Sequence, residues 1–120
     1  MQEVIAERYF MSQEAEMAAK WKMFEDYKEL AARLSVLERE ANSIGVVINN
    51  LAVALMGSPQ KIGITREGFV SIPSGPGRQE LNIAKVDVAG ITKLIQEIQE
   101  TAKQKGELHV KLTQLGMSLP

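Results

Sequence analysis

The chain has 120 residues, of which 45% are hydrophobic and only 5% aromatic, a composition typical of an aliphatic helical core in one domain. The formal net charge is −1, with six basic and nine acidic residues in 1–58 and eight basic and six acidic residues in 59–120. Neither half is basic enough to favour nucleic-acid binding.

Cysteine is absent from the sequence, which excludes disulfides, cysteine-based zinc sites and a thiol nucleophile, and fits a reducing compartment. Histidine occurs once, at His109, so most metal-site templates are excluded as well. Residues 1–7 interleave acidic and apolar side chains, unlike a signal peptide, and no stretch approaches the roughly 20 apolar residues of a membrane span. We therefore expect a cytoplasmic protein that uses no metal, no cofactor and no membrane.

A long helix is predicted over residues 12–57, with Ser12 as its N-cap and Gly57-Ser58-Pro59 as a strong stop. From Tyr27 onward, apolar side chains recur at alternating spacings of three and four, the pattern of a coiled coil. A kink or a break is expected at Gly45, because glycine and the β-branched residues that follow it are weak helix formers. The stripe comprises Tyr27, Leu30, Leu34, Leu37, Ala41, Ile44, Ile48, Leu51 and Leu55.

A small β-element is predicted over residues 61–86. Residues 62–65 and 69–72 have the composition of two short strands joined by a turn, and residues 81–86 alternate like a third strand. Between them, the Pro-Ser-Gly-Pro-Gly run at 73–77 is expected to be a loop.

A second helix is predicted over residues 87–116, with Asp87 as its N-cap and an end near Gly116. The predicted fold is therefore mainly α: an antiparallel helical hairpin, packed as a coiled coil, with a small β-hairpin or three-strand element between the helices, in a single domain over 1–120. The stripe of the second helix comprises Ile91, Leu94, Ile98, Thr101, Lys105, Leu108, Leu112 and Leu115.

Folding the two stripes together predicts a register in which paired residue numbers sum to about 146. Lys105 then lies opposite the small Ala41, which leaves room for its aliphatic stem while the ammonium reaches towards Glu38 or Glu40. The predicted pairs are Leu55 with Ile91, Ile48 with Ile98, Leu37 with Leu108 and Leu34 with Leu112.

In this register Met17, Trp21 and Phe24 extend beyond the second helix and expose a large apolar surface. A partner chain could cover it. Alternatively, Tyr9, Phe10 and Met11 could fold back over it as a short third helix or strand.

A second apolar surplus lies in residues 44–56, which are hydrophobic on nearly all faces of a helix. One neighbouring helix covers only one stripe, so Val46, Val47 and Val53 need another surface. The open strands with Ile62, Ile64 and Phe69 also offer edges that pair with copies of themselves. We therefore expect a homo-oligomer whose contacts lie near the β-element.

Residues 71–79 are the one stretch that contains the groups needed for an anion-binding site, although this pattern is weaker than those above. Flexible glycines, serine hydroxyls and arginines could together bind a phosphate or a nucleotide, although the stretch matches no P-loop or dinucleotide fingerprint. The alternative is a plain connector or a protein contact. The candidate ligand-binding residues are Arg66, Ser74, Gly75, Gly77 and Arg78.

Catalysis is not expected. His109 lies on the flank of the second stripe with no neighbour that would make it a base or a ligand. The acidic residues of both helices alternate with Lys and Arg at helical spacing, as on a solvated face.

The layout of a long helix, a β-hairpin and a shorter helix resembles the β-type subunit of prefoldin. The resemblance implies a chaperone whose subunits assemble through their strands and present coiled-coil ends to unfolded chains. The sequence departs from that pattern in the long Gly/Pro loop 73–79 and the third strand.

The functional hypothesis is a non-enzymatic coiled-coil protein that self-associates and binds another protein, in an assembly, adaptor or inhibitor role. Two alternatives remain open. One is a prefoldin-like holdase that binds many unfolded chains weakly. The other is a protein that binds a small anionic ligand through Arg66, Arg78 and the Gly/Pro/Ser loop.

Overall fold

The computed structural model contains two long helices with a three-stranded antiparallel sheet between them in the chain, which confirms the predicted mainly helical fold class. It describes the backbone of residues 2–84 and 86–119, and the side chains of 13–84 and 86–119. The chain divides into two compact units, each of which is described separately below. Unit 1 comprises residues 1–35 and 99–120, and unit 2 comprises residues 36–98.

Helix α1 (Gln2–Gly57) begins ten residues before the predicted start and continues without a break through Gly45. The expected break is therefore wrong. A Cβ at Gly45 would meet no atom within 4 Å, so this glycine is an exposed residue on the helix surface and not a packing necessity. Residues 9–11 belong to α1, so the alternative of a third helix or strand is also wrong; their side chains lie outside the described residues.

The sheet consists of β1 (Gly63–Arg66), β2 (Phe69–Ser74) and β3 (Gly77–Asn82), in the order β1-β2-β3, and follows the single turn of 3-10 helix η1 (Pro59–Lys61). The predicted loop at 73–77 is wrong, because all but two of its residues belong to β2 or β3. The third strand also begins four residues before the predicted residue 81. Sequence reasoning treated two prolines as loop markers, but Pro73 occupies a strand and Pro76 a two-residue turn.

Glycines set both turns of the sheet. Gly75 has a φ of +55° and precedes Pro76 in the tight β2–β3 turn, as the first central residue of a type II′ hairpin does. Gly68 has a φ of +78° in the β1–β2 turn, and a Cβ there would lie 2.8 Å from the Cβ of Ala84. Gly68 is therefore required both by its backbone conformation and by the chain that passes it.

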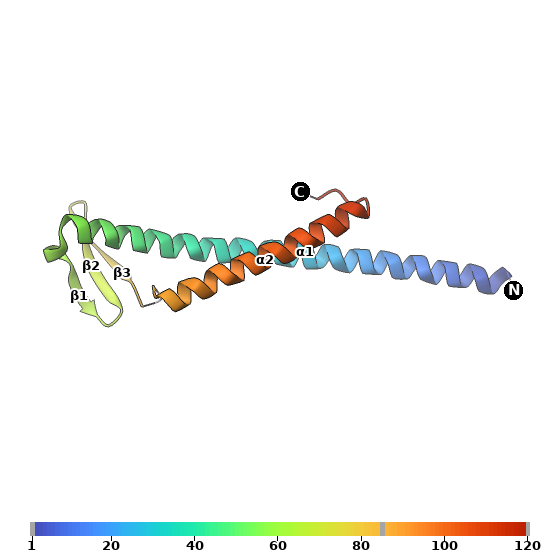
Figure 1. Cartoon of the computed structure of the whole chain (residues 1–120), viewed down its shortest axis with the longest axis horizontal. Helices are drawn as coiled ribbons and strands as arrows, with labels where there is room; N and C mark the ends of the chain where they lie inside the picture. The colour runs from blue at the N-terminus through green and yellow to red at the C-terminus, as the bar shows by residue number, and fades with distance from the viewer. Residues whose placement is uncertain (1, 85, 120) are drawn as a thin grey trace. The chain divides into compact units, whose positions relative to one another are not determined.

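The sheet packs against the last turns of α1 within unit 2 (Figure 1). Val70 and Ile72 of β2 and Leu81 of β3 are buried against Ala54, and Val47 and Leu51 pack around them. Alternation along β2 explains this core, because every second side chain faces the helix. Beyond Ile44, the covered stripe of α1 thus runs through Val47, Leu51 and Ala54 and not through the predicted Ile48 and Leu55.

Helix α2 (Val88–Gln114) has well-defined ends. The Asp87 carboxylate accepts a 2.6 Å hydrogen bond from the backbone N–H of Gly90, which confirms Asp87 as the N-cap. At the other end Gly116 has a φ of +84°, and the backbone N–H groups of Gly116 and Met117 donate to the carbonyls of Thr113 and Leu112. These two bonds form a Schellman motif, which explains why the helix ends there.

The predicted register between the helices is wrong by about ten residues in both units. In unit 2, Ile44 shares a small cleft with Gly90 and Leu94 of α2, whereas the predicted register pairs it with Ala102. In unit 1, Leu34 lines a cleft with Ala102 and Lys105 and not with Leu112. The segments of α1 and α2 are antiparallel within each unit, as predicted.

The sheet causes this shift. The predicted register gave α2 the whole length of α1 up to Leu55, with the β-element beyond it. The sheet instead covers Val47, Leu51 and Ala54, so α2 begins beside Ile44. Three helical turns span about 11 residues, which is close to this shift, so the apolar stripes still face each other.

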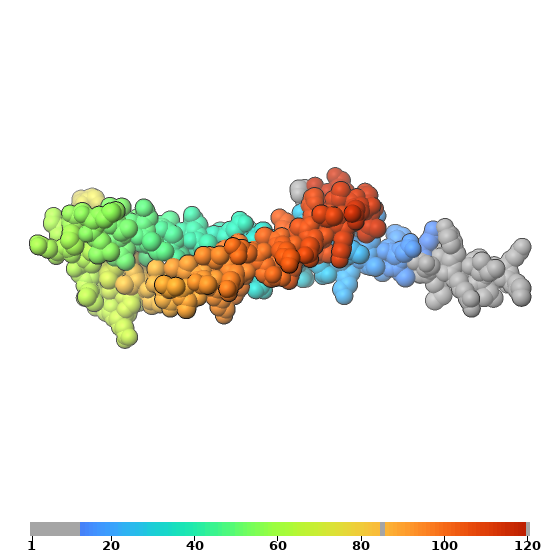
Figure 2. All heavy atoms as spheres, in the orientation of Figure 1, coloured from blue at the N-terminus to red at the C-terminus, as the bar shows by residue number. Residues whose placement is uncertain are grey.

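The shift also corrects two predicted details of unit 1. The ammonium of Lys105 lies 5.7 Å from the centre of the Tyr27 ring, whereas the predicted register directed it towards Glu38 or Glu40. The end of α2 reaches the segment predicted to extend beyond it, because Lys20 donates a 2.9 Å hydrogen bond to the carbonyl of Leu115. Figure 2 shows the red end of α2 lying against the light-blue turns of α1.

Candidate functional site

The last turns of α1 carry an uncharged surface on the part of the helix that the sheet does not cover, with Val46 and Val53 on one flank and Ile48 and Leu55 on the other. No charged residue occurs between Glu40 and Lys61. Several large apolar side chains in this stretch are more than a third exposed, although the sheet covers the rest of the helix surface. We call this surface the apolar face of α1; it comprises Val46 (49% exposed), Ile48 (40%), Val53 (59%), Leu55 (54%) and Met56 (80%).

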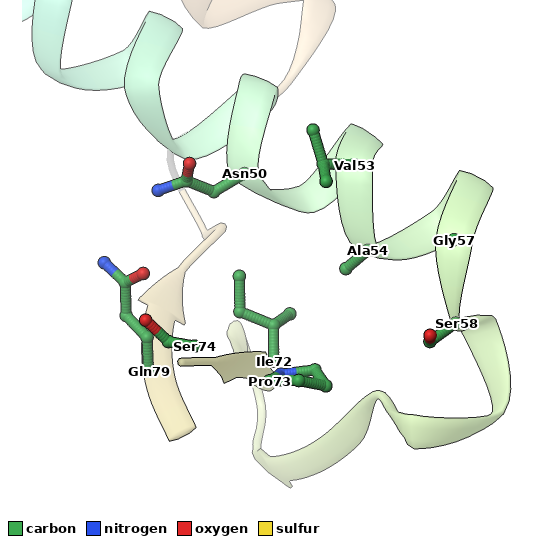
Figure 3. Close-up of a pocket in the computed structure, with 9 residues that line it drawn as sticks. All are labelled: Asn50, Val53, Ala54, Gly57, Ser58, Ile72, Pro73, Ser74 and Gln79. Carbon is green, nitrogen blue, oxygen red and sulfur yellow. The ribbon is translucent and has the colours of Figure 1, made fainter. Parts of the chain in front are cut away.

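A cleft of about 300 Å³ lies between this part of α1 and the β2–β3 hairpin (Figure 3). Val53, Ala54 and Ile72 form its apolar wall. Asn50 projects from the helix and Gln79 from β3, so two amide groups lie at the rim. The cleft therefore joins the apolar face of α1 to the β3 side of the sheet.

Three residues of α1 were predicted to mediate self-association near the β-element, and two of them, Val46 and Val53, lie on the apolar face. Val47 is different, because it packs against the buried cluster of the sheet. Conversely, sequence reasoning did not select Ile48, Leu55 and Met56. It assigned the first two to the helix–helix stripe. The uncharged run from 41 to 60 was a signal that could have identified all three.

The predicted strand residues occupy three different environments. Ile62 packs against the buried cluster. Ile64 is 85% exposed on the edge strand β1. Phe69 is partly covered by the guanidinium of Arg66, whose central carbon lies 3.8 Å from the ring centre, within the range of a cation–π contact.

The face of the sheet away from α1 is polar and internally bonded. Arg78 donates from Nε to the hydroxyl of Ser71 at 2.8 Å, and from Nη2 to the carbonyl of Ser71 at 3.0 Å and to the carbonyl of Lys61. Arg66 makes a longer 3.4 Å ion pair with Glu80. These contacts connect the chain before β1 to β2 and β3.

The structure does not bring the candidate anion-binding residues together. Strand pairing places Arg78 opposite Pro73, and Ser74 opposite Gly77, so Arg78 and Ser74 project from opposite faces of the sheet. Ser74 lines the cleft beside α1, whereas Arg78 bonds to Ser71 on the other face. Gly75 forms the turn, and Gly77 begins β3.

Unit 1 carries the predicted aromatic surface. Trp21 is 62% exposed and Met17 is 72% exposed, even though α2 reaches this level of α1. The ring of Phe24 lies 5.7 Å from that of Trp21, and the ammonium of Lys28 lies 5.3 Å from the Phe24 ring centre. Met17 also lines a cleft of about 640 Å³ with Met23 and Leu115.

The side chains described are those of residues 13–84 and 86–119. This part of the chain contains no group of three or more His, Asp or Glu residues placed to hold a metal ion. His109 lies beside Tyr27, with ring centres 6.1 Å apart. None of the helices, as far as they are described, has the length and hydropathy needed to span a membrane.

Comparison with protein families, curated proteins and solved structures finds no match to this chain.

Proposed function

We propose that the chain is a non-enzymatic protein that self-associates through the apolar face of α1 and binds a further protein through the exposed aromatic end of unit 1. The observation that carries this proposal is the exposure of Val53, Leu55 and Met56 in a helix stretch without any charge. Large apolar side chains left exposed in an uncharged stretch are typical of protein–protein interfaces.

A second copy is the occupant that best fits this surface. Two-fold symmetry is the commonest symmetry of soluble oligomers, and in it the same surface of each copy packs against its equivalent on the other. The exposed part of α1, beside a sheet with open edges, can form such a contact. The proposed interface is isologous: Val46 and Val53 of one copy contact the same face of the other. Self-association would cover side chains that unit 2 leaves in water.

The aromatic end of unit 1 suits a different partner. Trp21 and Met17 are large, exposed and close to charged side chains such as Lys20 and Lys28. Interface hot spots are enriched in such aromatic residues with polar surroundings. We propose an adaptor or assembly role in which this end docks on one folded protein, and the three-four spacing of α2 supports coiled-coil packing of the helices behind it.

The test is the sedimentation behaviour of a Val46→Glu, Val53→Glu variant. Both side chains are exposed, so the substitutions leave the fold intact but introduce two charges into each copy of the proposed interface. We expect an oligomeric wild type and a monomeric variant with unchanged helical content.

The matched control is Val36→Glu, Val110→Glu, which places the same charges on exposed valines outside the apolar face of α1 (54% and 55% exposed). The control should remain oligomeric. An oligomer that survives the Val46/Val53 variant, or a wild type that is already monomeric, would contradict self-association through this face.

A further inference from the structure

The two edges of the sheet differ in their capacity to pair with another strand. Edge strand β1 has four residues and an irregular register between Ile64 and Arg66, and such bulges reduce edge-to-edge pairing. Edge strand β3 has six residues in unbroken register with β2. In the described part of the chain, no other strand hydrogen-bonds to the outer edge of β3.

The sequence of β3 is complementary in charge to itself. In an antiparallel pair of two β3 strands centred on Gln79, Arg78 of one copy lies directly opposite Glu80 of the other, twice per interface. Opposite charges at directly opposed positions stabilise a strand pair, and like charges destabilise it.

The neighbouring registers are worse. Centring the pair on Arg78 opposes two arginines, and centring it on Glu80 opposes two glutamates. A register centred between two residues would place the buried Leu81 opposite a residue of the polar face, which breaks the alternation of the sheet. The register centred on Gln79 avoids all three conflicts.

We propose that β3 pairs antiparallel with β3 of a second copy about a two-fold axis at Gln79, which forms a continuous six-stranded sheet. This inference rests on the proposed self-association and names the backbone contact that organises it. The guanidinium of Arg78 keeps its bonds to Ser71 and Lys61, because its Nη1 has no partner in those bonds and is available to Glu80 of the second copy.

The pairing is consistent with the position of the apolar face of α1. A two-fold axis perpendicular to the sheet keeps α1 of both copies on the same face. Val53 and Gln79 line one cleft, so this flank of α1 lies on the β3 side of the sheet (Figure 3). Pairing through β3 therefore brings the Val53 flanks of the two copies towards each other across the axis.

The direct test uses the absence of cysteine from the chain. A Gln79→Cys variant places one thiol of each copy at the two-fold axis, where directly opposed Cβ atoms lie roughly 4.5–5.5 Å apart. A short bis-maleimide should convert most of this variant to a covalent dimer. Thr65→Cys, on the exposed β1 edge, is the matched control and should react without forming dimers.

A charge reversal supplies the second readout. Glu80→Lys places a lysine opposite Arg78 of the other copy at both positions and should raise the dissociation constant roughly tenfold. Glu67→Lys makes the same change of charge in the β1–β2 turn and should leave the dissociation constant unchanged. Neither glutamate is part of the buried cluster, and the pair of Glu80 with Arg66 is exposed and long, so both variants should fold.

The outcomes separate this inference from the proposed function. A wild type that is monomeric at every concentration overturns both. Three results together overturn the β3 pairing alone. The oligomer is lost in the Val46→Glu, Val53→Glu variant, but Gln79→Cys gives no more covalent dimer than Thr65→Cys. In addition, Glu80→Lys has the same dissociation constant as Glu67→Lys.

Discussion

At the scale of single residues, the sheet depends on one backbone conformation and one side chain. Gly68 combines a left-handed backbone with close packing against Ala84, and Arg78 connects three segments through its guanidinium. Both residues are in unit 2, close to the proposed interface. Substitution of Gly68 therefore reports on the integrity of the sheet, whereas substitution of Arg78 also removes the proposed contact with Glu80 of the second copy.

Gly68→Ala should lower the free energy of unfolding by about 1–3 kcal/mol, because alanine is strained at a φ of +78° and its Cβ would meet Ala84 at 2.8 Å. Gly75→Ala is the matched control, since its φ is also positive but no atom lies within 4 Å of the added Cβ. Urea denaturation of both variants measures the difference. Equal losses would mean that the contact with Ala84 contributes nothing.

Arg78→Ala should destabilise the chain by about 1–2 kcal/mol, because it removes hydrogen bonds to Ser71 and to the carbonyl of Lys61. Arg66→Ala should cost less, about 0.5–1 kcal/mol, since its 3.4 Å pair with Glu80 is exposed. Thermal unfolding of the two variants provides the comparison. A larger loss at Arg66 would contradict the assigned roles.

At the scale of elements, apolar spacing predicted the helices and the stripe of α2 well. Ile91, Leu94 and Leu112 are all at least half-buried, because a 3.6-residue period leaves one way to cover such a stripe. The helix–helix register could not be predicted in the same way. Shifting one helix by whole turns keeps apolar residues opposed, and the deciding factor was the sheet on Val47, Leu51 and Ala54.

The candidate sites also differ in how far the sequence could predict them. Exposed valines at 46 and 53 could be identified because one neighbouring helix cannot cover a helix that is apolar all round. The anion-binding hypothesis depended on Arg78 and Ser74 sharing a loop. Instead they lie in paired strands, where alternation directs them to opposite faces, and composition alone does not distinguish a Gly/Pro loop from a tight hairpin.

The corrected register has a direct test in unit 1. A Leu34→Cys, Ala102→Cys variant should be cross-linked within one chain by a short bis-maleimide, because both positions line one cleft. Leu34→Cys, Leu112→Cys, the pair that the apolar spacing alone favours, should give little intramolecular product. Mass spectrometry of the peptides distinguishes the two, and efficient cross-linking of the second pair would restore the register of the sequence prediction.

At the scale of the whole molecule, the two proposed contacts between copies require the chain to be more than a monomer. The Val46 and Val53 flank of α1 and the open edge of β3 lie in the same unit, and one second copy can cover both. Docking of the aromatic end of unit 1 on another protein is a separate event. It should persist in variants that dissociate the oligomer, provided that Trp21 is unchanged.

The most direct test is the solution mass of the intact chain by light scattering over a range of protein concentrations. We expect a mass of about twice the 13.3 kDa of the single chain, which falls towards 13.3 kDa only at high dilution. A mass of 13.3 kDa at all concentrations would contradict self-association. It would mean that the apolar face of α1 stays exposed to water in the free protein.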